Sequence, residues 1–165
     1  MPIPNRAFPT PEHDHDHCLA DAMARATRAF EAHGSKLTPL RQRVFREIAS
    51  SHRAIGAYDV LERLAVKGTR LAPISVYRAL DALLEVGVVH RLESRNAFFA
   101  CHATHGVRQR QLVLACERCG LVAEAQGDRV FAALEKAAEA LSFMTLGALV
   151  EVTGLCVNCA ESEQS

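Results

Sequence analysis

Residues 73–101 read PISVYRALDALLEVGVVHRLESRNAFFAC, and this stretch decides the fold class. Its first half repeats apolar residues at three- and four-residue steps, which predicts an amphipathic helix. Residues 88–93 and 97–101 are then typical of two short strands, joined by a polar turn at Arg95 and Asn96. Helices followed by such a hairpin are typical of a winged helix-turn-helix. In that fold the second motif helix enters the major groove of DNA and the hairpin forms the wing.

Three further helical patterns precede this stretch. One begins at Leu19 and runs to about residue 33, where a glycine follows. The start of a second is indicated by Thr38 and Pro39, because threonine caps a helix and proline suits the first helical position. A third is expected over residues 57–66. The region from 19 to 102 is therefore expected to form one winged-helix domain.

The second half of the chain follows a different pattern. Short strands are expected at residues 112–115 and 121–124, then a helix, then a last strand at 148–152. The helix carries its apolar residues on one face: Val130, Leu134, Ala137, Ala138 and Leu141. Residues 103–165 thus read as a small α/β unit, so the whole chain is expected to be α+β. A core of this size is marginal and usually needs a metal or a partner chain.

Four of the six cysteines form two Cys-x-x-Cys pairs, Cys116 with Cys119 and Cys156 with Cys159. Four thiolates give the closed tetrahedral shell of a structural zinc site. Iron with the same ligands, disulfides and core cysteines are the alternatives. The first residues carry prolines, acids and histidines where a secretory signal needs a basic start and an apolar run. No run approaches the length of a membrane span. We therefore expect a cytoplasmic chain with reduced thiols and no membrane partner.

A second metal site is suggested by the hairpin. If Arg95 and Asn96 form a two-residue turn, His90 lies directly opposite Cys101, close enough for both to hold one ion. Two histidines follow directly and an acid lies on a later strand; the candidates are His102, His105 and Glu124. Such a mixed nitrogen, sulfur and oxygen shell suits zinc. The alternative is an exposed wing histidine beside a small buried cysteine.

The N-terminal residues 1–18 are expected to form a flexible tail. Residues 13–18, HDHDHC, alternate imidazole and acid without apolar partners. Short histidine-rich tracts bind metal weakly, and the alternative is that the tract is incidental.

Net charge is zero, but it is unevenly distributed. Residues 36–78 contain nine lysines and arginines against three acids, whereas residues 96–165 contain five against eight. A basic first half favours contact with a polyanion, although a solvated helix surface explains it equally well. An enzyme would need an oriented nucleophile and base, and no orienting group for a Cys101–His90 pair is evident. We expect neither catalysis nor a small organic substrate.

Several motifs together resemble the ferric uptake regulator (Fur) family of bacterial metalloregulators. They are KLTPLRQR at 36–43, AYDVL at 57–61, SVYRAL at 75–80 and the two Cys-x-x-Cys pairs. Within that family the sequence VGVVHRLES at 86–94, with Cys101, is most similar to the zinc uptake branch. The resemblance covers roughly residues 19–160.

The resemblance implies a zinc-responsive repressor that binds double-stranded operator DNA as a homodimer and controls zinc uptake genes. Residues 103–165 would form the dimerisation and metal-binding domain. It also implies two zinc ions per chain. One would be held by the four paired cysteines. The regulatory ion would be held by His90, Cys101, Glu124 and His105, with His102 as the alternative to His105. The implied DNA-binding residues are Arg41, Tyr58, Ser75, Tyr77 and Arg78.

The chain departs from the family pattern near the first cysteine pair. Relatives place a metal-binding histidine about seven residues before it, where this chain has Gln109. The usual His-x-His is replaced by Gln111 and Val113, which argues against the iron-sensing branch. Iron, manganese or peroxide sensing on the same scaffold is the first alternative. A zinc-ribbon adaptor or thiol protein that does not bind DNA is the second.

Overall fold

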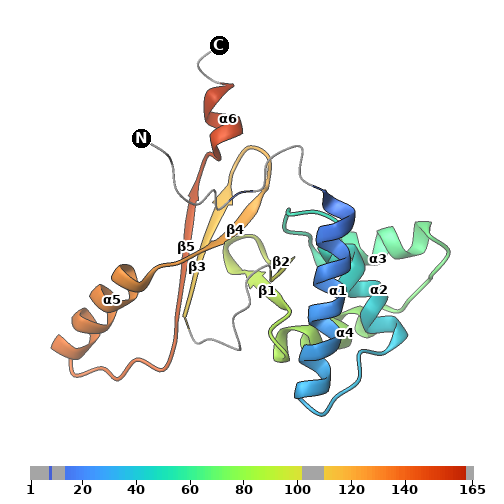
Figure 1. Cartoon of the computed structure of the whole chain (residues 1–165), viewed down its shortest axis with the longest axis horizontal. Helices are drawn as coiled ribbons and strands as arrows, with labels where there is room; N and C mark the ends of the chain where they lie inside the picture. Colours follow the sequence, from blue (N-terminus) through green and yellow to red (C-terminus); the bar gives the residue numbers. More distant parts are fainter. Residues whose placement is uncertain (1–7, 9–13, 102–109, 163–165) are drawn as a thin grey trace. The chain divides into compact units, whose positions relative to one another are not determined.

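The computed structural model describes Phe8 and residues 14–101 and 110–162. It divides into two compact units, which we call the helical unit (residues 9–104) and the sheet unit (residues 1–8 and 105–165). Figure 1 shows the elements of both units along the chain. Among the described residues, no helix is long and apolar enough to cross a membrane.

The described part of the helical unit contains four α-helices, α1 (His15–Ala32), α2 (Pro39–Ala49), α3 (Ala57–Val66) and α4 (Pro73–Glu85). The sequence patterns predicted α2, α3 and α4 correctly. Thr38 caps α2 by accepting a hydrogen bond from the backbone N–H of Arg41. The helices bury a common core, whose largest fully buried side chains are Phe30, Phe45, Ile48, Leu80 and Leu83.

The start of α1 was predicted wrongly. Helix α1 begins at His15, so residues 15–18 belong to a helix and not to a tail. Asp14 caps this helix by accepting a hydrogen bond from the backbone N–H of His17 at 3.1 Å. His15 and Cys18 are also half-buried, which gives the first turn contacts that the sequence pattern does not reveal. Asp14 is thus the N-cap of α1, and Asp16 lies in its first turn.

The wing consists of β1 (Val89–Leu92) and β2 (Ala97–Ala100), which pair antiparallel. His90 pairs with Phe99, so the predicted pairing of His90 with Cys101 is wrong. The connection is a short 3-10 turn over Glu93–Arg95 followed by Asn96 in the left-handed conformation, with φ of 48°. The two-residue type I′ and II′ turns both require positive φ at the first central residue, which Arg95 does not suit, whereas asparagine tolerates that conformation.

A third backbone segment joins the wing. Ile55, in the connection between α2 and α3, forms an isolated antiparallel bridge with Phe98 of β2. Both hydrogen bonds of this bridge, from the backbone N–H of each residue to the carbonyl of the other, measure 2.8 Å. The connection over residues 50–56 is therefore attached to the wing as well as to the two helices.

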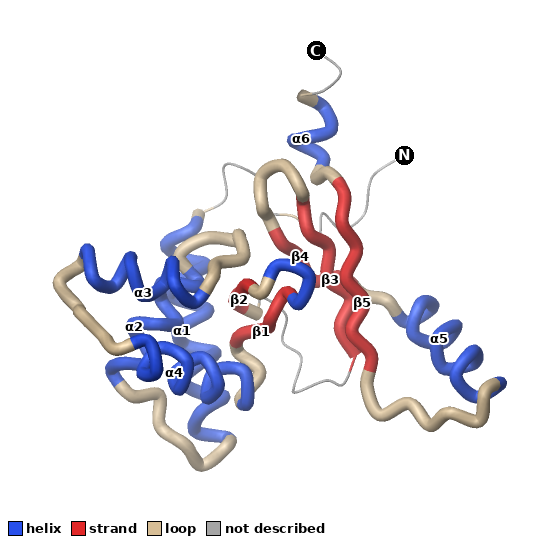
Figure 2. Tube along the Cα trace, turned by 180° about the vertical axis from the view of Figure 1, so that it is seen from behind, coloured by secondary structure: helices blue, strands red, loops and turns tan. Residues whose placement is uncertain are grey.

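The sheet unit is built on a three-stranded sheet of order β4-β3-β5, shown from behind in Figure 2. Strand β3 (Arg110–Cys116) pairs antiparallel with β4 (Val122–Ala125) and parallel with β5 (Ala148–Gly154). Helix α5 (Asp128–Ala140) lies between β4 and β5 in the sequence, within the long connection that the parallel pair of β3 and β5 requires. A short helix, α6 (Val157–Glu161), follows β5.

The predicted apolar face of α5 is largely exposed. Phe131 is the one described residue of α5 that is buried. Val130 and Leu134 are about four-tenths exposed, and Leu141, just after the helix, is 81% exposed. Further exposed apolar side chains lie in the connection to β5 and along β5: Phe143, Met144, Leu146, Leu149 and Val152. The single chain thus leaves several large apolar side chains of the sheet unit exposed to solvent.

Candidate metal centres and nucleic-acid interface

The two Cys-x-x-Cys pairs come together because of the sheet register. Cys116, the last residue of β3, pairs with Gly154 at the end of β5, which brings Cys156 two residues later beside it. The backbone N–H of Cys156 donates to the Sγ of Cys116 at 3.4 Å. Cys119 follows in a tight turn closed by a hydrogen bond from Gly120 to the Cys116 carbonyl, and Cys159 lies in α6. The structure thus collects all four thiols at one end of the sheet.

The spacing of these thiols fits a tetrahedral metal ion. The four Sγ atoms lie within 4.8 Å of one another, and those of Cys119 and Cys156 are 3.7 Å apart. A tetrahedron with zinc–sulfur bonds of about 2.3 Å has sulfur–sulfur edges of about 3.8 Å. Cys116, Cys156 and Cys159 are buried, and Phe8 and Leu121 pack against the cluster. The donor set and its closed surroundings are those of a structural zinc site.

The thiols of this cluster do not titrate alike. Burial alone would raise the pKa of Cys116, but backbone N–H groups of Cys119 and Cys156 offset it and lower that pKa to about 6. Burial raises the pKa of Cys119, and burial with hydrogen bonds from the neighbouring thiols raises that of Cys159 to about 12. Hydrogen bonds from backbone N–H groups thus favour the thiolate form of Cys116. A dication is the partner that lets all four ionise.

A second pair of candidate ligands lies on the wing. His90 faces the same side as Phe99 and Cys101, so the histidine and the cysteine are diagonal rather than direct neighbours. The backbone N–H of Cys101 donates to the Val88 carbonyl at 3.0 Å. This hydrogen bond extends the pairing of the two wing strands as far as Cys101. A ring nitrogen of His90 and the Sγ of Cys101 still lie within 4.8 Å of each other. The predicted pair is therefore brought together despite the different register.

The other predicted regulatory ligands are Glu124, His102 and His105. Glu124 lies on β4 of the sheet unit, opposite Val113, with a half-buried side chain. His102 and His105 lie outside the described residues, as does Gln109.

Helix α4 has the two-sided character of a recognition helix. Val76, Leu80 and Leu83 bury one side in the core. Tyr77 and Arg78 are exposed on the other side, and Ser75 is half-buried in the first turn. An exposed arginine can make bidentate contacts with guanine or bind a phosphate.

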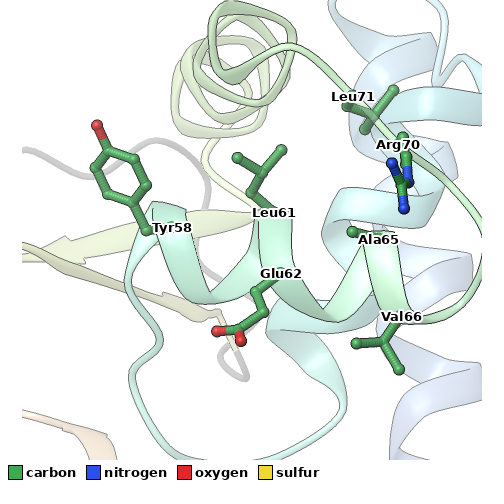
Figure 3. Close-up of a pocket in the computed structure, with 7 residues that line it drawn as sticks. All are labelled: Tyr58, Leu61, Glu62, Ala65, Val66, Arg70 and Leu71. Carbon is green, nitrogen blue, oxygen red and sulfur yellow. The ribbon is translucent and has the colours of Figure 1, made fainter.

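The two other predicted DNA-binding residues differ from each other. Tyr58, in the first turn of α3, is 71% exposed. It stands at one end of an open hollow of about 700 Å³, with Leu61 and Arg70 among the lining residues (Figure 3). Arg41 instead donates to the Lys36 carbonyl at 2.7 Å and lies over the ring of Phe30. The structure gives Arg41 a role in packing α2 onto the end of α1.

Sequence reasoning found only part of one group of potential metal ligands, because it singled out the tract at residues 13–18 and not its partner. His15 and Cys18, on the first turn of α1, lie beside His52, which follows α2. The i, i+3 spacing of the first two was visible in the sequence. The third was not, because nothing around His52 marks it as a partner.

Comparison with known proteins agrees with this architecture. The zinc uptake regulation protein of Escherichia coli K12 is 34% identical over 143 residues, which cover 87% of this chain and 84% of that protein. A solved structure of a zinc uptake regulator complexed with zinc and DNA has a TM-score of 0.82 at 33% identity, covering 89% of this chain and 98% of that one. The crystal structure of holo XcZur has a TM-score of 0.76 at 38% identity, covering 87% and 99%.

The family itself is matched directly. The model of the ferric uptake regulator family aligns with residues 32–153, which include α2 to α5, the wing and the sheet except the last residue of β5. With a relative that is 34% identical over most of its length, this match shows that the chain belongs to the ferric uptake regulator family.

Proposed function

We propose that this chain is a zinc-responsive transcriptional repressor that binds double-stranded operator DNA as a homodimer when loaded with zinc. It acts in the bacterial cytoplasm on genes of zinc uptake and homeostasis, and is a regulator rather than an enzyme. The observation that carries the proposal is the His90–Cys101 pair on the wing of a winged-helix unit. A thiolate beside an imidazole favours zinc over manganese or iron(II), which prefer harder ligand sets.

Two zinc ions per chain are proposed, with separate roles. Cys116, Cys119, Cys156 and Cys159 would hold the structural ion, which contributes folding free energy to a unit with a small core. His90, Cys101, Glu124 and His105 would hold the regulatory ion, with His102 as the alternative to His105. The support for the first is the 3.7 Å sulfur separation, and for the second the proximity of His90 and Cys101.

The proposed regulatory ligands come from both units of the chain. An ion bound by all of them favours the relative orientation of the units in which the ligands converge. Zinc therefore raises the DNA-binding population only by its differential affinity for that orientation. This is the switch that we propose.

DNA contact is proposed for the exposed side of α4. Tyr77 and Arg78 would face bases or phosphates from the major groove, supported by Ser75, while Tyr58 and Arg41 would contact the backbone. The exposure of Tyr77, Arg78 and Tyr58 supports this assignment. The contacts of Arg41 within the protein make it the weakest member of the set.

Homodimerisation is proposed through the sheet unit. In the sheet of the described residues, β5 is an edge strand, and an edge strand can pair with a second chain. Exposed apolar side chains of α5, of the following connection and of β5 accompany that edge. A second copy that covers this surface would supply the burial that a small unit lacks.

The function is tested by the binding of the full-length protein to an uptake-gene promoter fragment across buffered free zinc. We expect a shift that appears with zinc, weakens steeply with salt, and is not reproduced at equal free concentrations of manganese or iron(II). A shift driven by those ions would identify the iron or manganese branch. The absence of any salt-dependent shift at all would favour a protein adaptor.

A further inference from the structure

We propose that His15, Cys18 and His52 form a third metal site, which binds zinc or a similar divalent transition metal inside the helical unit. The site is separate from the four-cysteine cluster and from the pair on the wing. It would join the first turn of α1 to the connection that follows α2, and it extends the proposed function by one further ion per chain.

The three side chains are brought together by local structure. His15 and Cys18 are three residues apart on α1, so they lie on the same face of its first turn. His52 reaches them from the segment that follows Ser50, the C-cap of α2. One potential ligand atom from each residue lies within 4.8 Å of the other two, and the Cys18 Sγ is 3.9 Å from the His52 Nε2. All three side chains are half-buried.

These separations are close to those of a loaded site. In a tetrahedral site with zinc–nitrogen bonds of about 2.0 Å and zinc–sulfur bonds of about 2.3 Å, a nitrogen and a sulfur ligand are about 3.5 Å apart. The Cys18 Sγ and the His52 Nε2, which are 3.9 Å apart, would therefore need to approach each other only slightly to bind one ion. The rings of His15 and His52 meet edge to face, with centroids 5.3 Å apart, so neither ring stacks over the other.

One ring nitrogen of His15 is held by the backbone. Its Nε2 is 2.5 Å from the Ser50 carbonyl oxygen, which can only accept a hydrogen bond. Nε2 therefore carries the proton, and the neutral ring keeps its lone pair on Nδ1, which is buried. Metal-binding histidines usually donate their other ring N–H to a carbonyl or carboxylate in this way, which fixes both tautomer and ring direction.

The donor set defines the class of ion. Two imidazoles and one thiolate suit zinc and its close relatives and disfavour magnesium, calcium and manganese. Three protein ligands leave a fourth position for water. His17 is exposed and lies 3.4 Å from Asp21, in an i, i+4 pair on a different part of the helix surface. It is thus a natural control, with the same residue type and the same helix turn but no place in the cluster.

A metal bound by His15, Cys18 and His52 would restrain residues 50–56, the segment that pairs with the wing. The connection over residues 50–56 carries His52 and, three residues later, Ile55, which bridges to Phe98 of β2. An ion bound by α1 and by this connection would restrain both. The site therefore offers the DNA-binding unit a metal-dependent restraint of its own, within one unit and independent of the regulatory ligands.

The proposal is tested by following a single thiol. Full-length protein is alkylated with iodoacetamide across buffered zinc, and the modification of Cys18 is measured by peptide mass spectrometry. We expect zinc to slow alkylation of Cys18 at least about tenfold, because a metal-bound thiolate is a poor nucleophile. The protection should survive in His17→Ala and disappear in His52→Ala. Equal rates with and without zinc in the parent, or full protection in His52→Ala, would overturn the proposal.

The Cys101→Ser background separates this site from the regulatory one. Protection of Cys18 should persist there, since none of its ligands is changed; loss of protection would mean that zinc acts on Cys18 through the wing. Zinc per chain, counted in the same background at saturating buffered zinc, should fall by one in Cys18→Ser and His52→Gln and stay constant in His17→Ala. Circular dichroism checks that each variant is folded. An unchanged count in both folded ligand variants would reject the site.

Discussion

Single thiols in this chain differ according to where the fold places them. Cys116 ends a central strand, where backbone N–H groups stabilise its thiolate and lower its pKa to about 6 against the effect of burial. Cys159 is buried in the same cluster, and its pKa is raised to about 12. Cys101 lies buried just after β2, beside a histidine. The same residue type therefore occurs in a cluster proposed to hold a structural ion and in a pair proposed to bind the regulatory ion.

Replacing one ligand of the cluster tests its structural role. Cys116→Ser and Cys159→Ser are each expected to give a poorly folded or monomeric protein, because loss of a ligand removes folding free energy along with the metal. Circular dichroism, light scattering and metal counting measure the three consequences. A stable dimer with full metal content in both variants would contradict the assignment.

Replacing one residue of α4 tests the DNA contact. Arg78→Ala is expected to weaken operator binding by about 1–3 kcal/mol, the range for a bidentate base contact, without changing zinc content or dimerisation. Titration of operator and of unrelated DNA distinguishes the two kinds of contact, because loss of a phosphate contact lowers affinity for both and reduces the salt slope. An unchanged operator affinity at moderate salt would show that α4 is misassigned.

At the scale of elements, helices were more predictable than their connections. The bounds of α3 follow from apolar periodicity and the glycine after it, and the start of α2 from a threonine cap and a proline. The wing register was not predictable, because it depends on a 3-10 turn and on one asparagine with positive φ. The start of α1 was missed since a partner of its first turn, His52, is distant in sequence. Motifs located the candidate ligands, whereas tertiary structure decided which of them meet.

The turn between β1 and β2 gives a separate prediction. Asn96 has φ of 48°, and its side-chain oxygen accepts a hydrogen bond from Arg91 at 2.7 Å. Asn96→Val is expected to destabilise the protein by about 1–2 kcal/mol, because a β-branched residue resists the left-handed conformation. Asn96→Gly is the matched control, and we expect only a small loss there. Urea unfolding of both variants measures the difference; equal stability would refute the turn geometry.

At the scale of the whole molecule, the chain exposes apolar surface in the unit expected to dimerise. Leu149, on β5, is 43% exposed, whereas Val66, at the end of α3 in the helical unit, is 83% exposed. Exposure alone therefore does not mark the interface. The edge strand and the neighbouring apolar residues distinguish the surface around β5.

These two residues give a matched test of the interface. Leu149→Glu is expected to shift the zinc-loaded protein from dimer to monomer, because it places a charge in the apolar part of the interface. Val66→Glu should leave the dimer intact. Sedimentation equilibrium of both variants decides, and a dimer of unchanged affinity in Leu149→Glu would place the interface elsewhere.

The central claim is that zinc controls DNA binding through Cys101, and counting zinc in Cys101→Ser tests it most directly. The variant is measured beside the parent for zinc per chain and for operator binding at buffered zinc that saturates the parent. We predict a folded dimer that retains its four-cysteine zinc, has lost one zinc per chain and fails to bind operator, since the thiolate favours zinc over harder-ligand metals. The parental zinc stoichiometry together with parental zinc-dependent DNA binding would contradict the account.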